Sequence, residues 1–357
     1  MDELKLGTPS GKWVQDREAS SDVVISSRVR LARNLASHPF PQWAHPDDLQ
    51  AVGSAVGVAL SSSKMLSGYG FHALENLSPL ERQRLVEEHV ISPEFAGLEK
   101  GYFLALSQDQ KVALMVNEED HLRIQALYPG FRVAAAWETA SRVDDEVGKE
   151  LEYAFSEKWG YLTACPTNTG TAMRVSIMLH LPALMMTKQL PQLWGALTQL
   201  GVVVRGLFGE GTHAAGNLFQ VSNNTTLGRT EEEIVAHLTN VGMQIVERER
   251  TARKILYGEA KDKLADRAYR AVGILKYAKM MSFAEAIELL SMVRLGVDLG
   301  LVTDIDGATI NELAFLIRPA CLEMQAGRAI GEEKEEAVRS KVIQAKLAQV
   351  RGGEQGV

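Results

Sequence analysis

The stretch GYFLALSQDQKVALMVNEEDHLRIQAL, residues 101–127, decides the fold class of this chain. It contains three short runs that are rich in apolar residues, at 101–106, 112–116 and 122–127. Runs of this length predict β-strands, and the polar residues 107–110 between the first two predict a hairpin loop. Neighbouring strands that are joined by short loops favour an antiparallel sheet with helices packed on it.

The same strand signals recur on both sides of this stretch. Short apolar runs predict further strands at residues 23–29, 159–164, 173–181, 202–207 and 218–221, and helical spacing predicts a helix at 133–155. After Gly228 the character changes, because Thr230 followed by three glutamates is typical of a helix N-terminus. Helical periodicity then continues to residue 349. We therefore expect an α+β fold, with a mostly antiparallel sheet flanked by helices and then an all-helical C-terminal domain.

The length of 357 residues suggests two domains. We expect a short N-terminal extension at 1–21, a sheet-containing domain at 22–256, a helical domain at 257–350 and a flexible tail at 351–357. No basic-then-apolar leader opens the chain, and its most apolar stretch, at 175–186, is too short to span a bilayer. Cys165 and Cys321 lie far apart, which argues against a disulfide framework or a structural zinc site. These observations predict a cytoplasmic protein.

Charge and missing motifs exclude several classes of protein. The formal net charge is −7, so the chain lacks the overall basic footprint of a nucleic-acid-binding protein. It has no P-loop sequence and neither the His-Arg-Asp nor the Asp-Phe-Gly motif of eukaryotic-type protein kinases. Residues 304–307 resemble a calcium loop only faintly, because alignment on Gly307 puts Val302 and Leu313 at ligand positions. We expect a capping loop between two helices there.

Arginines gather on and around the first predicted strand. In extended geometry alternate side chains share a face, so Arg28 and Arg30 would point the same way, about 7 Å apart along the strand. Two cations held side by side are unfavourable unless an anion lies between them, and guanidinium groups suit an oligophosphate. Arg123, Arg174 and Arg205 stand at the ends of other predicted strands. From the first strand alone, an ordinary solvated basic strand remains the simpler interpretation.

Four segments together resemble the signature set of the phosphagen (guanidino) kinases, in the order of that family. They are SSRVRLARN at 26–34, NEEDHLRI at 117–124, CPTNTGTAMR at 165–174, and RGLFGEGT followed by VSNNTTLG within 205–228. Within the family, the chain resembles most the bacterial protein-arginine kinases. Metabolite guanidino kinases carry a helical N-terminal domain that encloses the free substrate, whereas here the pattern begins at once and a helical domain follows it. Without that enclosure, an arginine side chain on a protein could reach the site.

The resemblance implies phosphorylation of arginine in proteins by direct in-line transfer, with ATP and Mg²⁺ as cofactors. Magnesium would bridge the phosphates with few protein ligands, so no metal site built from side chains is expected. The arginines would neutralise the phosphates and the moving phosphoryl group. The nucleotide-binding residues that the resemblance implies are Ser26, Ser27, Arg28, Val29, Arg30, His89, Arg123, Arg174, Val175, Ser176, Ile177, Met178, Arg205, Gly206, Leu207, Phe208, Gly209 and Glu210.

The resemblance also implies four catalytic residues, Glu119, Glu210, Cys165 and Arg205. The acceptor guanidinium has a free pKa above about 12, and a cation is a poor nucleophile. Two carboxylates could hold it in plane, orient one nitrogen and take its proton. Glu119 is the better candidate for the base, with Glu210 as its partner. Cys165, as a thiolate, would help to hold the cation, although buried packing is the commoner role of a cysteine.

The family also implies properties of the C-terminal domain. In protein-arginine kinases it is associated with dimerisation and with a phosphoarginine pocket marked by an Arg-Asp-x-x-Arg-Ala motif. Residues 335–340 keep only Arg339 of that motif, and two acids replace its first pair, so a phosphoarginine would be repelled there. The family further implies a homodimer, protein substrates with exposed arginine, and a role in bacterial stress response. Its implied partners are a zinc-binding activator protein, a heat-shock repressor and a Clp-type ATPase, with no DNA and no membrane.

Two other functions stay open at this point. The chain could be an adaptor that binds phosphorylated or unfolded proteins without catalysis, although the presence of both Glu119 and Glu210 argues against this. It could also be a kinase of free arginine or of another small guanidino compound. An assay with ATP, magnesium and casein, repeated with free arginine, separates the three.

Overall fold

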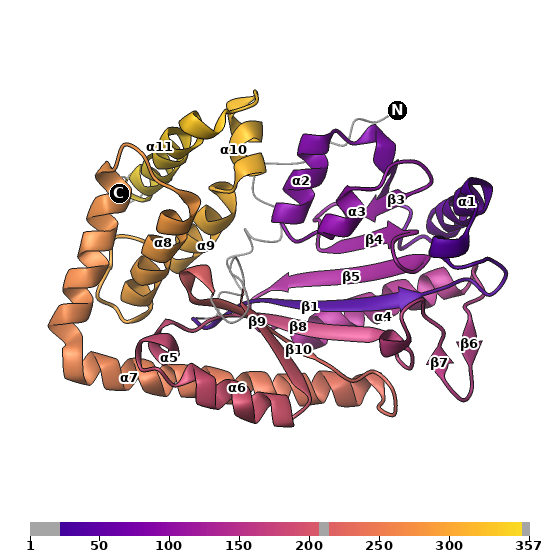
Figure 1. The fold of residues 1–357 in the computed structure, drawn as a ribbon, viewed down its shortest axis with the longest axis horizontal. Helices are drawn as coiled ribbons and strands as arrows, with labels where there is room; N and C mark the ends of the chain where they lie inside the picture. Colours follow the sequence, from indigo (N-terminus) through magenta and orange to yellow (C-terminus); the bar gives the residue numbers. More distant parts are fainter. Residues whose placement is uncertain (1–21, 207–213, 352–357) are drawn as a thin grey trace.

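A computed structural model describes residues 22–206 and 214–351, and in this part of the chain an eight-stranded antiparallel sheet forms the centre of the fold (Figure 1). Its strands, in spatial order, are β2 (Gly70–Ala73), β3 (Phe103–Leu106), β4 (Val112–Val116), β5 (Leu122–Pro129), β1 (Val24–Arg33), β8 (Met173–His180), β10 (Leu218–Asn223) and β9 (Val202–Gly206). Every neighbouring pair is antiparallel. A separate small hairpin pairs β6 (Phe155–Ser156) with β7 (Gly160–Tyr161).

The two faces of the sheet differ because side chains alternate along each strand. On one face, apolar residues such as Val29, Leu31 and Ile177 are buried in the main core. Helices α1 (Pro46–Ser62), α4 (Val133–Gly148) and the first half of α7 contribute to that core. On the other face, α2 (Pro79–Glu87) and α3 (Pro93–Ala96) cover only β3 and β4. The middle of that second face carries polar side chains, and the candidate site lies there.

The remaining helices follow the sheet. They are α5 (Pro182–Met186), α6 (Leu190–Gln199), α7 (Glu231–Tyr277), α8 (Phe283–Asp298), α9 (Gly307–Leu316), α10 (Pro319–Ala326) and α11 (Glu332–Arg351), with short 3₁₀ turns at Pro41–Trp43, Leu74–Asn76, Pro166–Asn168 and Ala215–Asn217. Helices α8, α9 and α11 and the second half of α7 surround a second core of their own. No helix within the described ranges is long and apolar enough to cross a membrane.

Helix α7 belongs to both cores. It is 47 residues long, and Figure 1 shows it running under the sheet and then turning towards the helical region. Ala260 has non-helical backbone angles (φ −143°, ψ 31°), which accounts for the change of direction. The boundary expected near residue 256 therefore lies inside a helix, close to this kink. The division of the chain into domains stays a prediction.

The α+β prediction is confirmed, and most expected strands are present with small shifts at their ends. The side chain of Thr230 caps α7 by accepting a hydrogen bond from the backbone N–H of Glu233, as expected. Asp306 caps α9 in the same way, which confirms a capping loop at 304–307.

One helix and one strand are shorter than predicted. The helix expected at 133–155 ends at Gly148, because Tyr153 then forms a β-bridge with Leu35 and the next residues enter β6. The strand expected at 159–164 is reduced to Gly160–Tyr161, since only its start pairs with β6.

Candidate active site

A cleft of about 980 Å³ lies on the polar face of the sheet. Strands of the sheet form its floor, and the segment around α3 forms one wall. Its lining includes residues from segments far apart in the sequence that the fold brings together. These residues are Arg28, Arg30, Val86, His89, Ile91, Ser92, Pro93, Glu94, Leu98, Met115, Glu118, Glu119, Arg123, Gln125, Arg174, Arg205, Gly206 and Gln220.

All five arginines that the sequence singled out line this cleft. Arg28 and Arg30 share one face of β1, as the alternation predicts. Arg30 stands directly opposite Arg174 in the pairing of β1 with β8. Like charges in direct cross-strand pairs destabilise a sheet, so this pairing needs a compensating anion. Arg123 and Arg205 approach from β5 and β9, and Arg205 is exposed at the rim.

The electrostatics of the cleft also favour an anion. Burial, followed by the charges of Arg123 and Arg174, lowers the pKa of Arg28 to about 10. The pKa of Arg30 is lowered well below its usual value, first by burial and then by the neighbouring arginines. Moreover, the Nε atoms of Arg30 and Arg174 are buried and have no hydrogen-bond partner within the described ranges. Buried donors are almost always paired in proteins, and a bound oxyanion would pair these two.

Strand β10 orients two of the arginines by contacts that the sequence did not reveal. Arg28 donates to Oε1 of Gln220 at 2.7 Å and to Oγ of Ser176 at 3.4 Å, and Arg174 donates to Oγ of Ser222 at 3.3 Å. Gln220 and Ser222 alternate on β10 opposite Met178 and Ser176 on β8, so they share the cleft face. The alternation of polar residues at 220 and 222 was the available signal, but register with β8 is not visible from sequence.

The predicted acid, Glu119, stands at the mouth of the cleft. It is exposed, and it also lines an adjoining cavity of about 110 Å³ together with Asp120, Asn168 and Thr226. Partial burial raises the pKa of the Glu119 carboxyl, and the nearby Asp120 and Glu118 add to the rise against the opposing effect of Arg123. A carboxylate with a raised pKa is a better proton acceptor, which suits a general base.

Glu118 holds two neighbouring side chains in place. Its carboxylate accepts a hydrogen bond from Nη1 of Arg123 at 2.5 Å and another from the hydroxyl of Ser92, at the start of α3. Glu118 therefore fixes Arg123 and ties the sheet to the wall of the cleft.

The loop that contains Cys165 is held against this corner. Asp120 accepts hydrogen bonds from Nδ2 of Asn34 at 2.6 Å and from the backbone N–H of Ala164 at 2.7 Å. Its buried carboxylate thus joins the end of β1 to the residue before Cys165. The Cys165 sulfur lies 3.0 Å from Oγ1 of Thr167 and is partly exposed, and it does not line either cavity.

The other expected nucleotide residues have several placements. Val29, Val175 and Ile177 point into the main core on the opposite face, and Ser27 is buried there with its hydroxyl donating to the carbonyl of Gly130 at 2.8 Å. Their side chains therefore do not reach the cleft. Ser26, Ser176 and Met178 are buried on the cleft side of the sheet. Gly206 lines the cleft. Four predicted residues lie outside the described ranges: Leu207, Phe208, Gly209 and Glu210.

His89 lines the cleft, as expected, in an uncommon conformation. Its φ angle is 61°, in the left-handed region that residues other than glycine rarely adopt. Gln125 on β5 donates to the carbonyls of His89 at 2.8 Å and of Val90 at 3.0 Å. Burial, and then the charges of Arg318 and Arg28, keep the pKa of His89 well below its usual value, so the ring is neutral at pH 7.

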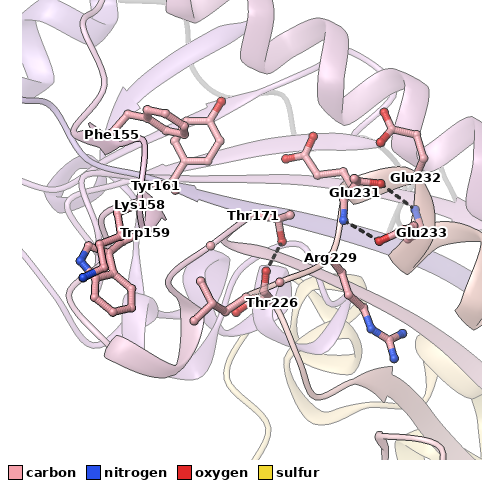
Figure 2. Close-up of a pocket in the computed structure, with 15 residues that line it drawn as sticks. Phe155, Lys158, Trp159, Tyr161, Thr171, Thr226, Arg229, Glu231, Glu232 and Glu233 are labelled. Carbon is pink, nitrogen blue, oxygen red and sulfur yellow. Dashed lines mark hydrogen bonds between the residues drawn. The ribbon is translucent and has the colours of Figure 1, made fainter.

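A second hollow, a groove of about 610 Å³, lies beside the small cavity (Figure 2). Figure 2 shows Trp159 and Phe155 on one side of the groove and Glu231 and Glu232 across from them. Phe155 is 57% exposed and Trp159 is 47% exposed, which is unusual for such large apolar side chains. Thr226 lines both the groove and the small cavity, so the two hollows share a wall.

Arg339, the one residue kept from the phosphoarginine motif, is used inside the protein. It is 1% exposed, donates to the carbonyls of Ile317 at 2.9 Å and Met281 at 3.0 Å, and forms an ion pair with Glu335. A guanidinium that is neutralised by an adjacent carboxylate offers little attraction to a phosphate. The expectation that a phosphoarginine is repelled at residues 335–340 stays a prediction.

The residues of the cleft suit a metal that arrives with phosphates rather than one held by the protein. No group of three or more His, Cys, Asp or Glu side chains within residues 22–206 and 214–351 could hold a metal ion. Glu118 and Glu119 line the cleft together with its arginines, and Glu118 forms an ion pair with Arg123. Their carboxylates could accept hydrogen bonds from the hydration water of a magnesium ion that is bound with the nucleotide.

Two family models match consecutive parts of the chain. Residues 52–252 match the model for the ATP:guanido phosphotransferase C-terminal catalytic domain. Residues 261–356 match the model for the protein-arginine kinase McsB C-terminal domain. The two matches meet near the kink of α7.

Similar proteins cover almost the whole chain. One from Symbiobacterium thermophilum, named protein-arginine kinase, is 46% identical over 340 residues, which are 94% of this chain and 96% of that protein. One of the same name from Pelotomaculum thermopropionicum is 45% identical over 339 residues, 94% of this chain and 95% of that protein.

Solved structures of guanidino kinases share the fold. The duplicated taurocyamine kinase from Schistosoma mansoni, with bound components of a transition state analog, is 25% identical with a TM-score of 0.60, over 69% of this chain and 35% of that chain. A lombricine kinase is 21% identical with a TM-score of 0.59, over 73% of this chain and 75% of that chain.

Proposed function

The chain belongs to the ATP:guanido phosphotransferase family and, within it, to the protein-arginine kinases, and on this premise we propose that it phosphorylates arginine side chains of proteins with ATP. The observation that carries the proposal is the pairing of Arg30 with Arg174, whose buried Nε atoms lack partners within the described ranges. Such a pair favours an oligophosphate. Glu119, a carboxylate with a raised pKa, lines the same cleft and could accept the proton of a guanidinium.

The proposed mechanism is a direct transfer. An Nη atom of the acceptor arginine attacks the terminal phosphorus of ATP, the N–P bond forms as the bond to the bridging oxygen breaks, and ADP leaves. Phosphoryl transfer depends mostly on positioning and neutralisation of charge, which the five arginines supply. Arg28 and Arg174 are held by Ser and Gln side chains, and Arg123 is held by Glu118, so these cations are oriented before substrate binds. Magnesium, when bound with the nucleotide, would add further neutralisation.

Glu119 would remove the proton that the attacking nitrogen loses. The free guanidinium has a pKa above about 12, so deprotonation has to accompany attack rather than precede it. By family resemblance Glu210 would be the second carboxylate and Cys165 would lie beside the guanidinium. Asp120 supports this arrangement, because its hydrogen bond to Ala164 holds the Cys165 loop close to Glu119.

Protein substrates, rather than free arginine, fit the open surroundings of the small cavity. The groove in Figure 2 shares Thr226 with that cavity, and it presents aromatic and acidic side chains to solvent. Residues that flank an acceptor arginine could lie there. Free arginine has no flanking residues that could bind to this surface.

The function is tested by incubating the protein with Mg·ATP and casein and measuring acid-labile phosphate on arginine. We expect incorporation with the native chain and a loss of it with Glu119→Gln. Free arginine in place of casein should be a much poorer acceptor. If no phosphoarginine forms while casein binds, the chain is the adaptor considered above; if free arginine is preferred, it is a metabolite kinase.

We also propose the cellular setting that the family resemblance implies. The chain would act in the cytoplasm in a bacterial stress response, marking proteins for a Clp-type protease. A zinc-binding activator protein and a heat-shock repressor would be partners. A homodimer through the helical region is supported by Tyr269, Tyr277 and Met280 near the end of α7, which are 53%, 77% and 56% exposed. Light scattering coupled to size-exclusion chromatography tests it.

A further inference from the structure

One wall of the nucleotide cleft is held from two sides. The segment that contains His89 follows α2 and lines the cleft. From the sheet, Gln125 donates to two successive carbonyls of this segment. From the helical region, α9 and α10 pack against the same segment, although they lie more than 220 residues further along the chain.

The end of α2 caps the start of α10. The carboxylate of Glu87 accepts hydrogen bonds from the backbone N–H groups of Ala320 at 3.1 Å and Cys321 at 3.2 Å. These N–H groups lie in the first turn of α10, whose own N-cap residue, Arg318, makes no side-chain cap. A carboxylate at this position satisfies free N–H groups and interacts favourably with the helix dipole. Glu87 thus does for α10 what a local capping residue does in other helices.

Arg318 completes the contact. Its Nη1 atom donates to the backbone carbonyl of Glu87, and its guanidinium lies over the ring of Phe315 at 4.4 Å. The Phe315 ring in turn meets the ring of His89 edge to face, with centroids 5.8 Å apart. Glu87, Phe315 and Arg318 are 8%, 3% and 5% exposed, so solvent does not compete for these contacts. The left-handed backbone of His89 is therefore fixed through Glu87 and Phe315 as well as through Gln125.

We infer that Arg318 is a positioning residue for nucleotide binding and that the helical region sets the affinity of the cleft through it. Arg318 acts through Glu87 and Phe315 on His89, and it does not line the cleft itself. The inference rests on the proposed function, because it takes the cleft to be the nucleotide site. Coupling of this kind is reciprocal, so a nucleotide in the cleft must also stabilise the seating of α10 on Glu87.

Nucleotide binding to the full chain tests the inference without requiring turnover. The dissociation constant of Mg·ADP is measured by calorimetry for Arg318→Met, which keeps the apolar stem but removes the donor. Phe315→Leu is the second variant, in case the first does not fold. The matched control is Phe283→Leu, because that ring also lies beneath an arginine of the helical region, Arg339 at 5.9 Å, but packs against the core of that region.

We expect the dissociation constant to rise about 5- to 10-fold for Arg318→Met and Phe315→Leu, the lower part of the usual range for coupled sites. The dissociation constant of the control should change by less than about twofold, even if its melting temperature falls as much as that of the other two variants. With casein as acceptor, KM for ATP should rise while kcat at saturating ATP changes little. If Arg318 had a purely structural role, its replacement would lower the stability of the protein without raising KM for ATP selectively.

Hydrogen exchange gives an independent readout in the native chain. Mg·ADP should slow exchange of the amides of Ala320 and Cys321, although they lie outside the cleft. Equal exchange with and without nucleotide, or equal affinity losses in Phe315→Leu and Phe283→Leu, would overturn the inference. If the native chain bound no nucleotide at all, the proposed function would fail and the inference with it.

Discussion

Replacing Arg30 by methionine should stabilise the protein in the absence of nucleotide. Arg30 faces Arg174 across two paired strands, and its Nε atom is buried without a partner in the described part of the chain. Methionine keeps most of the unbranched apolar stem and removes the charge. In most proteins the loss of a half-buried arginine is destabilising, so a gain in stability would be a specific signature of a cation held for an absent anion.

The size of the gain follows from Coulomb's law. Two unit charges about 6 Å apart repel by about 3 kcal/mol at an effective dielectric constant near 20, and by about 0.7 kcal/mol at that of water. Arg30 keeps a solvent-exposed edge, so we expect about 1–2 kcal/mol. For a chain of this length, that corresponds to a rise of about 1–3 °C in the melting temperature.

Nucleotide should narrow or reverse the difference in stability between the two proteins. At a ligand concentration 100 times its Kd, binding stabilises the native chain by about 2.7 kcal/mol. Losing one charge-assisted hydrogen bond to phosphate weakens binding by about 10- to 100-fold. At the same concentration, the variant would then gain only about 0.4–1.4 kcal/mol.

Thermal unfolding with and without Mg·ADP measures both effects. Arg142→Met, at an exposed arginine on α4, is the matched control. It should change neither the melting temperature without nucleotide nor the shift that Mg·ADP produces. Adding salt should reduce the gain in the variant without nucleotide, because salt screens the repulsion that the substitution removes. If Arg30→Met melted lower than the native chain while its shift with Mg·ADP stayed unchanged, the argument that this pair of cations awaits an anion would be wrong.

Four other outcomes are expected. Glu119→Gln should leave Mg·ADP binding intact and lower turnover by about 10²–10⁴, as measured by phosphoarginine formation. Because the pKa of Glu119 is raised and the base acts deprotonated, activity should fall as pH drops through that pKa; Glu118→Gln removes a like charge and should move this acid limb to lower pH. Asp144→Asn leaves the buried Arg33, 2.6 Å from it in the native chain, without its main counter-ion, so urea unfolding should show a loss of about 3–5 kcal/mol. Trp159→Ala should raise KM for casein several-fold but not KM for ATP, whereas equal KM values for casein would remove the groove from substrate binding.

The strands and the common face of Arg28 and Arg30 were predictable because they depend on local periodicity. The alternation of side chains with a period of two can be read directly from the sequence. The short loop at 107–110 joins β3 and β4 and permits only antiparallel pairing between them. Glu119, which the signature segments indicate as catalytic, lines the cleft, and its catalytic role stays a prediction.

Register and long-range contacts were not predictable in the same way. The pairing of Arg30 with Arg174 requires the relative shift of β1 and β8, which lie more than 140 residues apart. Gln220 reaches Arg28 only because β10 pairs on the far side of β8. The contact of Glu87 with α10 depends on how two cores pack together, and no periodicity within either segment reports it.

Helix α7 limits how this protein could have been assembled in evolution. Its first half supplies Leu238 and Ile245 to the core beneath the sheet, and its second half supplies Ala268 and Leu275 to the helical core. Near the middle, Arg253 forms ion pairs with residues before and after it in the chain, Asp22 and Asp298 among them. The helical region is therefore not a module that could be exchanged by joining genes at a loop. A recombination event would have to cut inside a buried helix, so the two halves are expected to be inherited together.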